Sequence, residues 1–123
     1  MRRAGARLTA IVAAFAATTL VLAVEAQDSF RVTYTIDQSN PEQVQIAGTV
    51  FNDAIQDVFD VYVTAEALDA RGKVVARGIA HVSARIPGRG SAPFVAKVPL
   101  VPAAVRYRAA VSGYRAGAGA QAP

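Results

Sequence analysis

The chain has 123 residues, 53% of them hydrophobic, and a formal net charge of +4. It contains no cysteine, one histidine and one methionine. This composition excludes disulfide bonds and thiolate chemistry, and it argues against a copper or zinc centre within one chain. The length is that of a single domain.

The N-terminal segment has the three parts of a secretory signal peptide. Arginines in the first seven residues precede residues 8–24, a run of 17 without a charge, and Val24-Glu25-Ala26 suits signal peptidase. We therefore predict that residues 1–26 are a cleaved signal peptide, that the mature chain starts at Gln27, and that the protein is periplasmic or secreted. The alternative is an uncleaved membrane anchor, although 17 apolar residues are few for crossing about 30 Å of hydrocarbon.

Alternation of apolar and polar residues predicts short strands through the rest of the chain. Turn residues such as Pro41, Gly72, Pro87 and Pro102 separate them. The predicted strands are 30–36, 44–50, 59–67, 73–78, 79–86, 94–98 and 105–111.

About seven short strands at turn-bounded intervals favour an all-β fold, a single Greek-key immunoglobulin-like β-sandwich over residues 27–114. A Gly/Ala-rich tail over residues 115–123 is expected to be disordered. The alternation places Val61, Val63 and Phe94 in the core, and it buries the ring of Tyr107 between solvated neighbours.

Charge is segregated along the mature chain. Residues 28–69 hold eight acidic residues and only Arg31 as a base, whereas residues 71–123 hold nine basic residues and no acidic one. One interpretation is that the two halves pair their charges across a sheet. The other is a basic face for an anionic partner, such as an acidic envelope polymer or the acidic face of a protein. The candidate basic residues are Arg85, Arg89, Lys97, Arg106 and Arg108.

Two further side-chain groups were candidates for chemistry. His81 and Ser83 share a strand face, but no nucleophile-elbow pattern surrounds any serine, so a hydrolase is not predicted. Asn52, Asp53, Asp57 and Asp60 lie close together between two strands, where oxygen ligands can hold calcium. Their spacing matches no EF-hand loop, and a turn whose Asn and Asp side chains bond the local backbone is the alternative.

The order of motifs resembles the bacterial FxLYD domain family. Gly48-Thr49-Val50-Phe51-Asn52 comes first, a central strand ends in Ala65-Glu66-Ala67-Leu68-Asp69, and a glycine hairpin follows at Gly72. Pro87-Gly88 then precedes the Phe94 strand. Ala65, Ala67 and Leu68 stand where the family has Phe, Leu and Tyr. The resemblance implies an extracytoplasmic β-sandwich accessory module with no catalytic residues.

These observations predict a non-enzymatic exported module that binds another protein or an envelope polymer, or that serves as a structural accessory. No cofactor, nucleic-acid partner or membrane span after cleavage is expected. The alternatives are a sandwich that binds a small ligand or calcium, and a secreted enzyme or inhibitor with a site that the sequence does not reveal.

Overall fold

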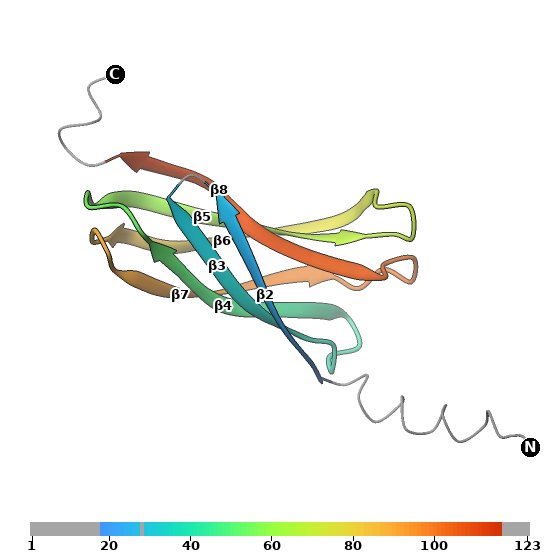
Figure 1. Cartoon of the computed structure of the whole chain (residues 1–123). Helices are drawn as coiled ribbons and strands as arrows, with labels where there is room; N and C mark the ends of the chain where they lie inside the picture. The colour runs from blue at the N-terminus through green and yellow to red at the C-terminus, as the bar shows by residue number, and fades with distance from the viewer. Residues whose placement is uncertain (1–17, 28, 117–123) are drawn as a thin grey trace, which may run out of the picture.

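The computed structural model describes residues 18–27, by their backbone, and residues 29–116. Within this part of the chain, six strands form two three-stranded antiparallel sheets packed as a sandwich (Figure 1). A further strand, β2 (Thr18–Gln27), pairs with the outer edge of the first sheet. In spatial order, the first sheet holds β3 (Phe30–Asp37), β4 (Gln43–Asn52) and β7 (Ser91–Pro99), and the second holds β6 (Val74–Ile86), β5 (Val58–Leu68) and β8 (Arg106–Ala116).

The chain passes between the two sheets three times. β3 and β4 form a hairpin in the first sheet, and β5 and β6 form a hairpin in the second. β7 then returns to pair with β4, and β8 crosses again to pair with β5. Each sheet is therefore completed by a strand distant in sequence from its neighbour, and the two inward faces enclose one core.

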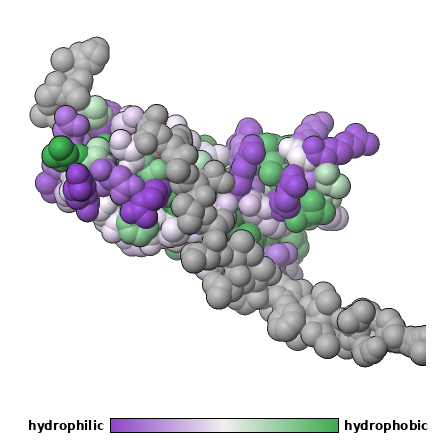
Figure 2. Space-filling model, viewed as in Figure 1, coloured by the Kyte–Doolittle hydropathy of each residue, from purple (hydrophilic) through white to green (hydrophobic). Residues whose placement is uncertain are grey.

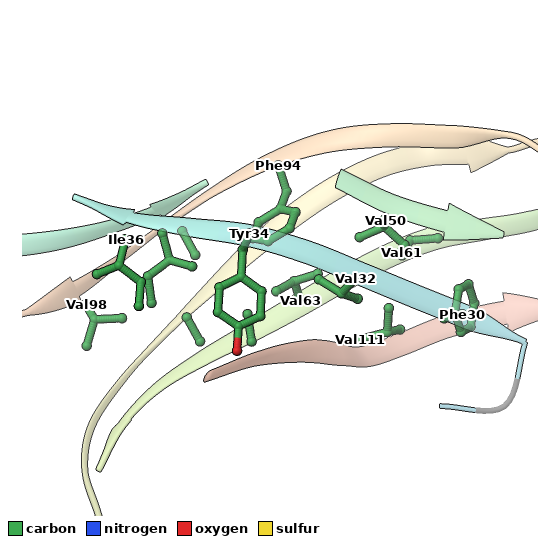
Figure 3. Close-up of a cluster of buried hydrophobic side chains, with 14 of the residues drawn as sticks. Phe30, Val32, Tyr34, Ile36, Val50, Val61, Val63, Phe94, Val98 and Val111 are labelled. Atoms are coloured by element: carbon green, nitrogen blue, oxygen red, sulfur yellow. The ribbon is translucent and has the colours of Figure 1, made fainter. Parts of the chain in front are cut away.

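Alternate residues of the strands fill this core, as the period-two pattern predicts (Figure 3). Val61 and Val63 are fully buried and Phe94 is 4% exposed, which confirms their predicted inward register. Tyr34 and Phe94 lie in register on either side of Gly48, so their side chains flank a residue that has none. A Cβ at Gly48 would fall 1.8 Å from the carbonyl oxygen of Thr33, so only glycine fits there.

The count of six strands differs from the predicted seven because the two predicted strands over 73–78 and 79–86 are one continuous strand, β6. Gly78 lies within this strand, and the chain does not turn there. Because glycine has no Cβ, the β6 backbone can approach β7; a Cβ at Gly78 would lie 2.0 Å from the backbone oxygen of Lys97. Gly78 therefore marks a close contact between the two sheets and not a chain reversal.

Both ends of the expected mature domain fall inside strands. Ala26 and Gln27 pair with Arg31 and Phe30, so the expected cleavage point lies within β2. β8 ends at Ala116, inside the expected tail. Residues 1–17 of the expected signal peptide and residues 117–123 of the expected tail lie outside the described residues. Among the residues that are described, no helix is long and apolar enough to cross a membrane.

Candidate functional site

The acidic and basic halves of the chain meet across the second sheet. β5 lies between β6 and β8, and its Glu66 stands in register with Arg77 on one side and Arg108 on the other. The Glu66 carboxylate lies 2.8 Å from the Arg108 guanidinium and 3.3 Å from that of Arg77. Hydrogen bonds from Arg108, and then from Arg77, lower the pKa of Glu66. Cross-strand pairing therefore uses part of the basic charge that the sequence segregates.

The four oxygen-bearing residues considered for calcium each have partners of their own. Each of the three carboxylates has its own arginine, and the described residues contain no group of three or more acidic or histidine side chains placed to hold a metal ion. The pairs are Asp53 with Arg31 at 2.6 Å, Asp57 with Arg85 at 2.9 Å, and Asp60 with Arg115 at 2.8 Å.

Asn52, the fourth of these residues, is buried and bonds backbone groups. It is 1% exposed, and its Nδ2 donates to the carbonyl oxygens of Gln56 at 2.8 Å, Pro87 at 3.2 Å and Ile86 at 3.3 Å. Its Oδ1 accepts from the backbone N–H of Ala54 at 3.1 Å. The side chain thus joins the β4–β5 loop to the β6–β7 turn and satisfies backbone groups of both.

Two of the motifs that carried the family resemblance, Asn52 and Pro87-Gly88, meet at this end of the sandwich. A Cβ at Gly88 would lie 1.8 Å from the carbonyl oxygen of Ile55, so the two connections pack backbone against backbone. The backbone N–H of Gly88 donates to Asp57 at 3.0 Å, and this bond is the largest cause of the lowered pKa of Asp57, followed by Arg85. Asn52 and Pro87-Gly88 therefore build the architecture of this end.

His81 and Ser83 each have a partner on a neighbouring strand or on β6 itself. His81 is exposed and lies edge-on to the Tyr62 ring, with centroids 5.0 Å apart. The Ser83 hydroxyl donates to the carbonyl oxygen of Arg85 at 2.7 Å and accepts from the N–H of the same residue at 3.1 Å. Both residues therefore have ordinary local partners on β6.

The five basic residues predicted as a partner surface are distributed over the molecule. Arg85 stands opposite Phe59 and Arg89 lies in the adjacent β6–β7 turn, at the end of the sandwich that Asn52 closes. Arg106 and Arg108 begin β8 at the opposite end, beside Leu68 and Glu66. Lys97 is exposed on β7 in the other sheet, so the structure brings together only neighbouring members of the set.

A second group of cations, of which the sequence pattern indicated only Arg106, gathers at the β5–β6 hairpin. We define the hairpin end as Arg71, Lys73 and Arg106. All three are exposed, and none forms an ion pair within the described part of the chain. A Cβ at Gly72 would lie 3.5 Å from the Arg106 guanidinium, so β8 brings Arg106 to the tip of the hairpin. Figure 2 shows strongly hydrophilic residues projecting where Figure 1 places this hairpin.

Asp69 fixes the shape of the hairpin end. Its Oδ1 accepts from the N–H groups of Arg71 and Lys73, both at 2.9 Å, and Gly72 supplies the positive φ of 84° that the turn requires. The N–H of Lys73 lowers the pKa of Asp69 most, and the N–H of Arg71 and the charges of Lys73 and Arg106 lower it further. Asp69 is therefore bound to its own turn, and Arg71, Lys73 and Arg106 are exposed.

In comparisons with protein-family models, curated proteins and solved structures, nothing matches this chain.

Proposed function

We propose that the protein is an exported, non-enzymatic β-sandwich of immunoglobulin-like type that binds an anionic partner through the hairpin end. The partner is either the acidic face of another protein or an anionic envelope polymer. The observation that carries this proposal is the group of three exposed cations, Arg71, Lys73 and Arg106, which form no ion pair within the described residues.

The contrast with the other arginines supports this choice of surface. Arg85 and Arg108 are held by Asp57 and Glu66, so part of their charge is neutralised where they stand. At the hairpin end, Asp69 accepts hydrogen bonds from backbone groups, and the charges of Lys73 and Arg106 act on it without an ion pair among the described residues. Several exposed cations of one sign raise the local potential and draw anionic partners, in a manner that weakens as salt shortens the Debye length.

The topology supports the immunoglobulin-like part of the proposal. Strands distant in sequence are neighbours in both sheets, as in Greek-key sandwiches, and β7 and β8 complete the two sheets alternately. The resemblance to FxLYD domains rests on residues such as Asn52 and Gly88. Here, Asn52 bonds backbone groups of two connections and Gly88 lets those connections pack closely. An accessory module that presents a surface agrees with both observations.

Cation-exchange chromatography with two matched triple variants tests the proposal. Arg71→Gln/Lys73→Gln/Arg106→Gln removes the three positive charges of the hairpin end. Arg85→Gln/Arg89→Gln/Lys97→Gln removes three positive charges from other parts of the surface. We expect the first variant to elute from a sulfonate resin at clearly lower salt than the second. Equal shifts would show that total charge sets the binding, and the hairpin end would lose its assignment.

A further inference from the structure

The position of strand β2 has a consequence for the processed protein, and this inference rests on the export and cleavage included in the proposed function. β2 covers the edge of β3 along its length, from Thr18 opposite Asp37 to Gln27 opposite Phe30. Cleavage after Ala26 removes every residue of β2 except Gln27. The processed chain therefore exposes the backbone edge of β3, which is a template for another strand.

We propose that this edge pairs with the same edge of a second copy, joining the two first sheets into one continuous sheet. β2 runs antiparallel to β3, and a second β3 related by a two-fold axis also runs antiparallel. With the axis at Tyr34, Arg31 stands opposite Asp37 of the second copy, and Thr33 stands opposite its Thr35.

This register is self-complementary on the solvent face. Arg31 and Asp37 lie on that face, because β3 alternates buried residues with these more exposed ones. Opposite charges in directly facing positions stabilise antiparallel pairs, and two threonines can hydrogen-bond across strands. The two-fold symmetry repeats the Arg31–Asp37 contact, so the dimer contains it twice.

Both charged groups have capacity for the additional contact. Arg31 donates from Nε and Nη2 to Asp53, at 2.6 and 3.0 Å, so three of its five N–H donors are outside that pair. Asp37 accepts from the N–H of Ser39 at 2.9 Å and from the Ser39 side chain, and a carboxylate has about four acceptor positions. The Arg31 guanidinium also lies over the Phe51 ring of β4, 4.4 Å from its centroid, so the contact with Asp37 of the second copy requires it to turn from β4 toward the free edge of β3.

The inner face of the joined strands is apolar in the same register. Val32 stands opposite Ile36 of the second copy, and Tyr34 meets its counterpart at the axis. These residues are 1%, 6% and 3% exposed with β2 present. A second copy of β3 therefore places branched and aromatic side chains where β2 lay.

Expression of the full chain and purification of its processed form test the proposal. We expect an intact mass that starts at Gln27 and a native mass, by light scattering, of a dimer. Retention of residues 1–26 would overturn both this proposal and the cleavage on which it rests, and it would leave the anionic partner of the hairpin end untouched. A processed protein that stays monomeric at high concentration, or that assembles only with a different protein, would overturn this proposal alone.

Disulfide trapping tests the register, because the chain has no cysteine of its own. An oxidised mixture of processed Thr33→Cys and Thr35→Cys proteins should form the mixed disulfide, since facing Cβ atoms in antiparallel pairs lie about 4.5–5.5 Å apart. The control is a mixture of processed Thr33→Cys and Thr49→Cys proteins. Thr49 lies on β4, one strand inward from the edge, so it should not face Thr33 of the second copy. Equal trapping with the control would contradict the register.

Charge reversal provides an independent readout. Asp37→Arg places like charges opposite each other twice in the dimer, so its dissociation constant should rise by about tenfold. Glu42→Arg makes the same charge change in the turn after β3 and should leave the dimer unchanged. Equal effects of the two substitutions would contradict the Arg31–Asp37 contact.

Discussion

Replacement of Asn52 by alanine tests how the two connections at one end of the sandwich are held. The substitution removes a buried side-chain amide. Its two N–H donors serve three carbonyl oxygens, so at least one hydrogen is shared, and its Oδ1 accepts from the N–H of Ala54. About three net hydrogen bonds are lost, each worth about 1 kcal/mol. Buried carbonyl groups left without a donor add to this loss. We therefore expect Asn52→Ala to lower the free energy of unfolding by at least about 3 kcal/mol.

The assay is urea denaturation followed by circular dichroism, with Asn40→Ala as the matched control. Asn40 is an exposed turn residue whose Oδ1 accepts from the N–H groups of Glu42 and Gln43 at 2.7 and 3.3 Å. Its loss should cost less than about 1 kcal/mol, because water replaces the acceptor. Hydrogen exchange should accelerate at the Ala54 and Gly88 amides in Asn52→Ala only. An Asn52→Ala loss no larger than that of Asn40→Ala would refute the bridging function.

Further predictions concern the core, acid stability and the close backbone approach. Phe94→Ala should lower the free energy of unfolding by about 3–5 kcal/mol in the same urea assay, whereas a loss below about 1 kcal/mol would mean that its ring is exposed. Glu66 and Asp57 have folded pKa values below their ordinary 4.5 and 3.8, so the stabilisation they give is present above these values and is lost as pH falls through the folded values. Urea midpoints should therefore decrease from pH 6 to pH 3, and Glu66→Gln should reduce the decrease; a midpoint independent of pH would contradict the ion pairs. Gly88→Ala should destabilise the fold in the urea assay because its Cβ has no room beside Ile55, and an unchanged midpoint would contradict this packing.

The strands were predictable because alternation is a local property. Val61, Val63 and Phe94 face the core as their period-two spacing predicts, and Tyr107 packs against the core while Arg106 and Arg108 are exposed. The number of strands was not predictable in the same way. Gly78 interrupts the pattern, and only the approach of β7 explains why a glycine stands within a continuous strand.

The candidate site depended on contacts that the sequence pattern does not encode. The segregated charge was compatible either with ion pairs between the two halves of the chain or with a basic face. In the spatial order β6-β5-β8, Glu66 lies between two arginines and forms an ion pair with each. The same order brings Arg106 to the hairpin at Gly72, a contact between residues far apart in the chain. For residues 18–27, an apolar run is compatible both with a secretory leader and with an edge strand, so its period could not distinguish the two.

Binding of a labelled poly-glutamate to the processed protein is the most direct test of the proposed function. Fluorescence anisotropy at about 20 mM and about 200 mM salt should show binding that weakens at the higher salt, where screening is stronger. Arg71→Gln/Lys73→Gln/Arg106→Gln should reduce the affinity by at least about tenfold at low salt, and Arg85→Gln/Arg89→Gln/Lys97→Gln should change it much less. An affinity that is the same in both variants, or that does not respond to salt, would contradict an anionic partner at the hairpin end.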